Sequence, residues 1–380
     1  MKKILQIVSA WGSGGVERYI TNFQKYMEND YQYVVLPLRP TKSKAIFTDE
    51  FDKYGGCVLD APVNIGATPI HRLKNRMLTV LKYVQEISCE IVHINGTTAD
   101  ILLYCWLIKR TFPGVKVVVH CHGDSVDPPH KGLKLFVHRM MKNIGLHKPD
   151  YCLGCSERAI TWMFSSNILN KCPHKVVYCG IEADAFKFSI ENRKKVRKEL
   201  ECPEGTLLIG TVGRMSSQKN PMFILDILNQ LKINKIKYKF LWIGTGALEE
   251  AVKKRATDLK IEDNIIFYGV CNNTSLMYSA MDVFILPSLY EGNPIVGFEA
   301  QASGLPCFFS DNIVKEAQAT DYVYFLPIEN TADIWAKSIE TCALNYHRED
   351  AKKKIIEAGQ NSKECAEKMM KIYKFVEESR

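Results

Sequence analysis

Short apolar runs rich in β-branched and aromatic residues alternate with longer amphipathic stretches along the whole chain. Runs of this length and composition are typical of buried strands, and strands that alternate with helices indicate a parallel, doubly wound sheet. The expected strands cover residues 3–9, 33–38, 90–95, 115–121, 151–155, 176–178, 207–212, 240–243, 265–268 and 282–287. The pattern therefore predicts an α/β protein.

The length of the chain bears on how many domains it forms. At 380 residues the chain is long for a single core, so we expect two domains. We predict one over residues 1–185, a polar, lysine-rich connection over 186–205, and a second over 206–360. Residues 361–380 are expected to form a helix that packs back on the first domain.

Targeting signals and cysteines bear on the compartment. The start of the chain, MKKILQIVSAWGSGG, breaks into glycine without a cleavage site, so we interpret it as a strand and not as a signal peptide. No segment approaches the roughly 20 apolar residues that span a bilayer. The 13 cysteines are scattered, and we expect reduced thiols in a cytoplasmic protein. Cys152 and Cys155 form a lone C-x-x-C pair, for which a zinc or redox role is the minor alternative.

Positive charge is concentrated in the first half. Residues 1–180 hold 23 Lys and Arg against 14 Asp and Glu, whereas the remainder holds 27 against 28. Residues 127–148 mix lysines and arginine with apolar side chains and predict a basic amphipathic helix. Such a helix can lie on an anionic membrane, at the inner face of the plasma membrane, or can be an ordinary solvated surface helix. Both interpretations stay open at this stage, and we expect no nucleic-acid partner.

The stretch 288–306, SLYEGNPIVGFEAQASGLP, carries the strongest indication of function. A buried strand precedes it, Pro294 is expected at the first position of a helix, and Gly304 and Pro306 end that helix. Free N–H groups and the dipole at a helix N-terminus bind anions. Two carboxylates flank this site, Glu291 and Glu299, and they are better suited to hydroxyl groups than to a phosphate. A phosphate seat beside two hydroxyl-binding acids indicates a nucleotide sugar.

Other predicted strands also end in polar or glycine-rich loops. Arg214 and Lys219 follow one strand and are able to hold a diphosphate, although they could be ordinary surface cations. The next strand leads into Gly244-Thr-Gly. His120 and His122 end a strand of the first half, where a histidine in a ligand site, structural hydrogen bonding and a metal site are all possible. The glycine loop at residues 12–15 does not have the dinucleotide-binding spacing.

Val212-Gly-Arg214, Lys219-Asn-Pro221 and Glu291-x7-Glu299 occur here in one order and in one half of the chain. This combination resembles the retaining GT-B glycosyltransferases of the large bacterial family with an E-x7-E motif (group 1, family 4-like), in particular those that build exopolysaccharide or capsule. The resemblance covers nearly the whole chain. It implies two Rossmann-like domains that face a central cleft, with acceptor binding in the first domain and donor binding in the second. Cys179-Gly-Ile departs from the usual Asn-Gly-Ile of the family.

The resemblance also implies roles for individual residues. Arg214 and Lys219 would neutralise the donor diphosphate, Glu291 would bind hydroxyls of the sugar, and Glu299 would bind the ribose. His122 would face the donor sugar. The remaining donor-binding positions that it implies are Gly14, Gly15, Gly213, Gly244, Val270, Gly292, Asn293, Pro294 and Ile295. No cofactor or metal would be required, since the D-x-D motif of metal-dependent transferases is absent from the sequence.

These residues lead to one main hypothesis and two alternatives. The main one is a retaining transferase that moves a sugar from a UDP-linked donor to a glycan or a lipid-linked saccharide. The alternatives are another GT-B enzyme, a nucleotide-sugar epimerase or a phosphorylase, and a non-catalytic binding subunit of a polysaccharide machine. An epimerase would convert a UDP-sugar without an acceptor, and a binding subunit would be favoured by loss of the cations or glutamates that are present here.

Overall fold

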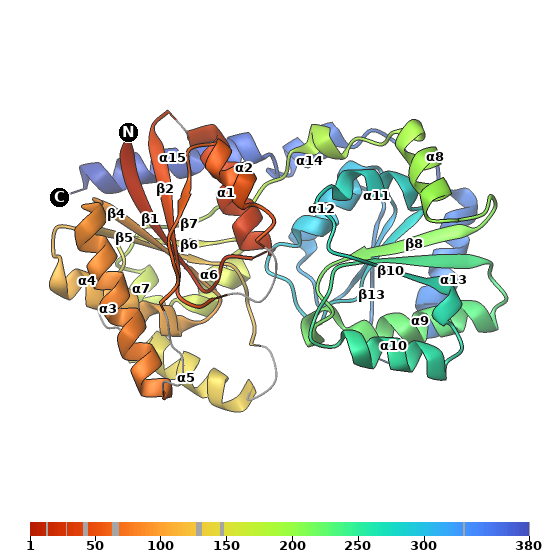
Figure 1. Cartoon of the computed structure of the whole chain (residues 1–380), viewed down its shortest axis with the longest axis horizontal. Helices are drawn as coiled ribbons and strands as arrows, with labels where there is room; N and C mark the ends of the chain where they lie inside the picture. Colours follow the sequence, from red (N-terminus) through yellow and green to blue (C-terminus); the bar gives the residue numbers. More distant parts are fainter. Residues whose placement is uncertain are drawn as a thin grey trace. The chain divides into compact units, whose positions relative to one another are not determined.

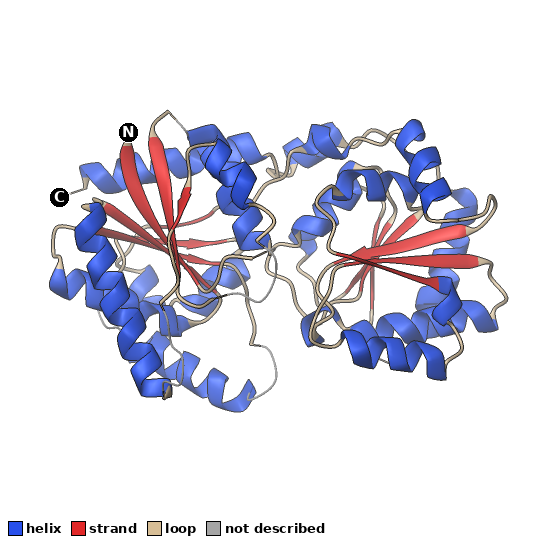
Figure 2. Ribbon diagram, in the orientation of Figure 1, coloured by secondary structure: helices blue, strands red, loops and turns tan. Residues whose placement is uncertain are grey.

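A computed structural model of the chain shows two α/β units, each built around one parallel sheet with helices packed on it (Figures 1 and 2). The first unit comprises Met1–Gly180 and Ser362–Arg380, and the second comprises Ile181–Asn361. The structure describes all residues except 13, 28, 41–44, 63–67, 127–130, 145–147, 330 and 380. The predicted parallel, doubly wound α/β architecture is confirmed.

The first unit contains a seven-stranded sheet in the order β3-β2-β1-β4-β5-β6-β7. Its strands are β1 (Lys2–Val8), β2 (Tyr31–Pro37), β3 (Cys57–Val58), β4 (Ile91–Gly96), β5 (Lys116–Cys121), β6 (Tyr151–Gly154) and β7 (His174–Val176). Its helices are α1 (Gly15–Met27), α2 (Thr48–Lys53), α3 (Pro69–Ile87), α4 (Leu102–Thr111), α5 (Lys131–Ile144), α6 (Glu157–Met163), α7 (Ser166–Leu169) and α15 (Ser362–Glu378). The last helix, α15, packs against α1 and so closes the unit with the end of the chain.

The second unit contains a six-stranded sheet in the order β10-β9-β8-β11-β12-β13. Its strands are β8 (Leu207–Val212), β9 (Tyr238–Ile243), β10 (Ile265–Gly269), β11 (Val283–Leu286), β12 (Cys307–Ser310) and β13 (Val323–Leu326). Its helices are α8 (Ile190–Glu199), α9 (Pro221–Ile233), α10 (Glu249–Asp258), α11 (Thr274–Ala280), α12 (Ile295–Ala302), α13 (Ala332–Asn345) and α14 (Lys352–Glu357). Buried aromatic side chains, Trp242 and Trp335 among them, fill its core.

In both units the strand order reverses direction at one point. The reversal falls between β1 and β4 in the first sheet and between β8 and β11 in the second. Ligands of open parallel sheets bind beyond the carboxyl ends of the strands at such a switch point. The topology therefore directs attention to the loops that follow β8 and β11.

Several elements differ from the sequence-based expectations. β3, β12 and β13, of two to four residues each, were not expected from the sequence. The site helix begins at Ile295, with Pro294 as its N-cap, one residue later than predicted. Within the region of the expected connection, 186–205, the chain forms α8, which packs against α11 of the second unit.

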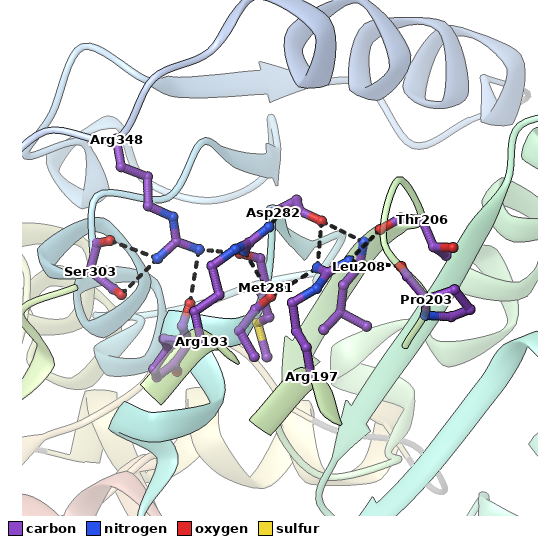
Figure 3. A network of polar contacts seen from close by, with 11 residues as sticks. Arg193, Arg197, Pro203, Thr206, Leu208, Met281, Asp282, Ser303 and Arg348 are labelled. Atoms are coloured by element: carbon purple, nitrogen blue, oxygen red, sulfur yellow. Dashed lines mark hydrogen bonds and ion pairs between the residues drawn. The ribbon is translucent and has the colours of Figure 1, made fainter. Parts of the chain in front are cut away.

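A network of arginines explains why α8 is fixed in the second unit (Figure 3). Arg193 and Arg197 of α8 pair with the carboxylate of Asp282 at 2.5 and 3.0 Å, and both also donate to the carbonyl of Ala280 at the end of α11. Arg348 donates to the carbonyls of Tyr278 and Ser303. Cations at helix C-termini satisfy carbonyls that lack intrahelical partners. The network thus binds α8 and the chain around Arg348 to the C-terminal ends of α11 and α12.

Candidate functional site

The loops that follow β8 and β11 lie side by side at the switch point of the second sheet. The N–H of Leu289 donates to the carbonyl of Gln218 at 2.8 Å, and the side-chain amide of Gln218 donates to the carbonyl of Tyr290 at 3.2 Å. Because β8 and β11 are hydrogen-bonded neighbours, both loops leave the same edge of the sheet. The two stretches that the sequence indicated as functional are therefore in direct contact.

An ion pair joins these two loops. Nζ of Lys219 lies 2.6 Å from Oε1 of Glu291, and the side chains are only 18% and 9% exposed. The amide of Gln218 lies 3.3 Å from the other carboxylate oxygen, Oε2. Both oxygens of Glu291 therefore accept a hydrogen bond, and the carboxylate is held in one orientation. This brings together two residues for which the sequence predicted separate roles.

Arg214 stands on the same loop as Lys219 but in a different environment. Its side chain is exposed, and in the described part of the chain its guanidinium has no hydrogen-bond or ion-pair partner. Its five N–H donors are therefore available to an anionic ligand. Of the two cations predicted on this loop, Lys219 is paired and Arg214 is not, as far as the described residues go.

The glycines of this edge allow close packing of backbone. Gly244 has a φ of +128°, and a Cβ placed on it would lie 2.2 Å from the carbonyl oxygen of Gly213. The N–H of Gly213 in turn donates to the carbonyl of Ile243 at 2.9 Å. A side chain at Gly244 would therefore push the Arg214 loop out of place. Val270, another of the predicted donor-binding residues, follows β10 and is exposed.

Helix α12 carries the second predicted acid. Glu299 is buried, and the hydroxyl of Tyr278 donates to its Oε2 at 2.9 Å and reaches the carbonyl of Val296 at 3.2 Å. Burial and the neighbouring carboxylate of Glu299 raise the pKa of Tyr278, which keeps the hydroxyl protonated as a donor. Tyr278 therefore holds the Glu299 carboxylate in one orientation.

The turn that precedes α12 is also held. Gly292 and Pro294 are buried, and Asn293 exchanges amide hydrogen bonds of 3.4 Å with Gln360. The backbone N–H of Ile295 belongs to the first turn of α12, where N–H groups lack intrahelical partners. They lie at the helix N-terminus that the sequence predicted to bind an anion, and this binding stays a prediction.

Two predicted histidines of the first unit lie at the carboxyl end of β5, with His120 inside the strand and His122 directly after it. His122 follows β5, and its Nε2 lies 2.8 Å from Oδ1 of Asn95, the penultimate residue of β4. The ring of His120 stands 4.0 Å from that of His122, and Nδ1 of His120 lies 3.3 Å from the hydroxyl of Tyr19. Burial lowers the pKa of His122 to about 3, so its imidazole is neutral near pH 7.

The glycine loop before α1 is occupied by a side chain of the protein. The N–H of Gly12 donates to Oε1 of Glu17 at 3.0 Å, and a Cβ on Gly14 would lie 2.7 Å from Oε2 of the same carboxylate. Helix α1 begins at Gly15. A phosphate at this loop would meet the Glu17 carboxylate, and the donor-binding role of Gly14 and Gly15 stays a prediction.

The described residues offer no built metal site and no membrane-spanning helix. They contain no cluster of three or more His, Cys, Asp or Glu side chains that could hold a metal ion. Among the helices that the structure describes, none combines the length and the apolarity needed to cross a bilayer. Cys152 and Cys155 are buried free thiols, and Sγ of Cys152 lies 3.3 Å from Sγ of Cys172.

Helix α5 forms the central part of the predicted basic segment. Residues 127–130 and 145–147 of that segment lie outside the described residues. Leu133, Phe136 and Met140 are 66%, 65% and 42% exposed, at a spacing that places them on one face. Lys134 and Arg139 are also exposed on this helix. The helix therefore presents apolar and cationic side chains together.

Two protein-family models match the chain. The model described as "Glycosyl transferases group 1" matches residues 192–362, and "Glycosyltransferase Family 4" matches residues 13–185. The chain belongs to the group 1 glycosyltransferases. The family and the enzyme class predicted from the motifs are therefore confirmed for this glycosyltransferase, whereas the retaining mode and the E-x7-E assignment stay predictions.

Individual relatives agree with this assignment. The chain is 24% identical over 377 residues to "Putative glycosyltransferase EpsF" of Bacillus subtilis (strain 168), covering 98% of this glycosyltransferase and 96% of the relative. It is 28% identical over 248 residues to the UDP-Gal:alpha-D-GlcNAc-diphosphoundecaprenol alpha-1,3-galactosyltransferase of Escherichia coli, covering 62% and 61% of the two chains. The solved structure of Anabaena Alr3699/HepE in complex with UDP and glucose aligns with a TM-score of 0.78 at 15% identity, over 98% of this chain and 100% of that chain. The last likeness shows the fold, which is GT-B.

Sequence reasoning did not find four residues that hold the predicted site in this glycosyltransferase. Gln218 and Tyr278 orient the two glutamates, Gln360 holds Asn293, and Asn95 orients His122. Each of these contacts joins residues that lie 21 or more positions apart along the chain. Only Gln218 carried a sequence signal, because it directly precedes the predicted Lys219.

Proposed function

We propose that this glycosyltransferase moves a sugar from a UDP-linked donor to a glycan or a lipid-linked saccharide, with retention of anomeric configuration, in cell-surface polysaccharide synthesis. One observation carries the proposal: Lys219 and Glu291 are paired across the two loops of the second switch point, beside the N-terminus of α12. The donor's diphosphate and sugar need a cation and a hydroxyl acceptor at adjacent positions, and this pair supplies both.

The chemistry follows from the leaving group. Cleavage of the anomeric C–O bond develops negative charge on the diphosphate, and preplaced cations stabilise that charge. The exposed Arg214, the Lys219 ammonium and the N–H groups at the start of α12 are the groups that do so here. No divalent metal is required in this proposal, since these groups provide the neutralising charge.

The two acids have separate tasks in this proposal. Glu291 accepts hydrogen bonds from hydroxyls of the transferred sugar, and Glu299 accepts them from the ribose. The Tyr278 hydroxyl donates to Oε2 of Glu299 and holds the carboxylate in position for this task. In the first unit, His122 contacts a sugar hydroxyl, and that unit binds the acceptor.

The printed names of the relatives support the choice of substrates. The Escherichia coli relative is named for a UDP-Gal donor and a diphosphoundecaprenol-linked acceptor, and the aligned Anabaena structure contains UDP. By analogy we assign a UDP-sugar and a glycan or lipid-linked saccharide to this chain. No described feature favours an epimerase or a binding subunit over a transferase.

A donor panel tests the reaction. Purified protein is incubated with UDP- and GDP-sugars, with and without a diphosphoundecaprenol-linked saccharide, and the released nucleotide is measured. We expect release of UDP that rises with the acceptor, and NMR of the product should show the anomeric configuration of the donor. Conversion of a UDP-sugar without acceptor, or an inverted product, would contradict the proposal.

Association with the membrane is part of the same proposal. The exposed apolar face of α5, with Lys134 and Arg139 beside it, suits an anionic bilayer surface, where a lipid-linked acceptor would be found. We expect sedimentation with phosphatidylglycerol vesicles that is lost in Phe136→Asp. Ile233→Asp, which alters an exposed apolar residue of α9, is the control. Equal binding of both variants would exclude this surface.

A further inference from the structure

A continuous chain of buried polar contacts runs from the C-terminal helix to the end of β5. The hydroxyl of Tyr373, on α15, accepts from Nε2 of Gln6 at 3.1 Å. Oε1 of Gln6 accepts from Nδ2 of Asn95 at 2.8 Å, and Oδ1 of Asn95 lies 2.8 Å from Nε2 of His122. The chain crosses the β1–β4 switch point, because Gln6 belongs to β1 and Asn95 to β4.

The surroundings of Asn95 fix which end of its amide faces the histidine. Its nitrogen lies 3.4 Å from the carbonyl oxygen of Ile7 and 3.5 Å from that of His93, positions where only a donor is favourable. Its oxygen therefore faces His122, and an oxygen can only accept. Consequently Nε2 of His122 carries the hydrogen, and Nδ1 carries a lone pair.

That lone pair is unpaired in the part of the chain that the structure describes. Nδ1 of His122 is buried and has no hydrogen-bond partner among the described residues. The titratable side chains against the ring are His120 at 4.0 Å, Tyr19 at 5.2 Å, and His93, which is stacked behind His120. Burial lowers the pKa of His122 to about 3, so the lone pair is present at neutral pH. A buried acceptor without a partner costs free energy unless a ligand supplies the donor.

We infer that Asn95 is a positioning residue, which holds His122 in the Nε2–H tautomer so that Nδ1 accepts a hydrogen bond from a hydroxyl group of a bound sugar. The inference rests on the proposed function, which gives His122 its contact with that sugar. Gln6 holds Asn95, and Tyr373 of α15 holds Gln6. Helix α15 therefore supports the orientation of the His122 side chain.

The tautomer itself is the first test and needs no substrate. Protein labelled with ¹⁵N-histidine gives long-range ¹H–¹⁵N correlations that distinguish the two tautomers and the imidazolium, and the signal lost in His122→Gln identifies the residue. We expect neutral Nε2–H imidazole throughout the neutral range. An Nδ1–H tautomer or an imidazolium would overturn the inference, whether or not the proposed reaction is correct.

The second test converts Asn95 into a charged analogue. Asn95→Asp keeps the shape and the acceptor for Nε2–H, but its carboxylate favours the imidazolium and raises the pKa of His122. Below that pKa Nδ1 becomes a donor and no longer accepts from the sugar. The added charge should raise a pKa of about 3 by about 1–3 units, so we expect kcat/KM of Asn95→Asp to fall between pH 7 and pH 4.5, with a smaller fall for the wild type. Parallel profiles would overturn the inference.

The role of α15 has a matched pair of variants. Tyr373→Phe removes the hydroxyl that accepts from Gln6, whereas Tyr33→Phe removes a buried hydroxyl that also contacts Tyr373, at 3.0 Å, but not Gln6. We expect a lowered kcat/KM and a second His122 tautomer in Tyr373→Phe, and an unchanged kcat/KM in Tyr33→Phe. Equal effects of the two variants on kcat/KM and on the spectrum would show that the hydroxyl of Tyr373 is only structural.

Discussion

The ammonium of Lys219 lies 2.6 Å from a carboxylate oxygen of Glu291, although the two residues are 72 positions apart in the chain. In the free protein each of these side chains neutralises the other. A bound diphosphate would offer Lys219 a second anionic partner, and sugar hydroxyls would offer Glu291 new donors. The pair therefore links the structure of the free site to its proposed chemistry.

Substitutions of Lys219 and Glu291 should have non-additive effects on the free energy of unfolding. Lys219→Ala removes the cation that pairs with the Glu291 carboxylate, whose side chain is only 9% exposed. We therefore expect the free energy of unfolding to fall by about 1–3 kcal/mol. Adding Glu291→Gln removes the unpaired charge and should restore part of the loss. Urea unfolding of the single and double variants gives the coupling energy, expected at about 1–2 kcal/mol. Additive effects would mean that the ion pair contributes nothing.

Arg214 should affect turnover and leave stability alone. Its exposed guanidinium has no partner among the described residues, so Arg214→Ala should leave the unfolding midpoint unchanged. If the side chain meets charge that develops on the diphosphate, kcat/KM should fall. The fall should correspond to a loss of about 2–4 kcal/mol of transition-state stabilisation. Steady-state kinetics with the active donor checks this, and a kcat/KM close to that of the wild type would remove Arg214 from the mechanism.

Gly244 should tolerate no side chain. Gly244→Ala brings Cβ within 2.2 Å of the Gly213 carbonyl, so the Arg214 loop must move and UDP affinity should fall together with the thermal midpoint. Gly205→Ala is the control, because Gly205 has a φ of +72° but nothing within 4 Å of its Cβ site. We expect the control to cost about 1–2 kcal/mol of stability and to leave UDP affinity unchanged. Similar UDP affinities in both variants would contradict the packing argument.

Stability should decline in mild acid because of the buried histidines. Burial lowers the pKa of His93, His120 and His122, so the unfolded chain, with histidine pKa values near 6.5, binds more protons than the folded one. Their contribution is therefore complete above about pH 6.5 and is lost as the pH falls toward 3.

Urea unfolding between pH 4.5 and 7 measures this slope. His122→Gln should reduce the slope by about one proton, or about 1.4 kcal/mol per pH unit. Equal slopes in the wild type and in His122→Gln would show that His122 titrates normally in the folded state.

The sequence predicted the architecture and the two loops because these features follow local rules. Short apolar runs indicated the strands, and residues after parallel strands gather at one edge of the sheet, so Lys219 and Glu291 could be expected close together. The contacts of Gln218, Tyr278 and Asn95 could not be predicted, since they depend on how side chains distant in sequence pack. The Glu17 carboxylate in the glycine loop was equally unforeseen.

The affinity of UDP tests the central assignment most directly. Isothermal titration calorimetry is performed on the wild type, Lys219→Ala and Glu299→Ala. Lys232→Ala is the control, because among the described residues Lys232 of α9 bonds only to the carbonyls of Leu259 and Lys260. Loss of one charge-assisted hydrogen bond should weaken binding by about 1.5–3 kcal/mol in each site variant, roughly 10- to 150-fold, and leave the control unchanged. UDP affinity equal to that of the wild type in both site variants would contradict the account.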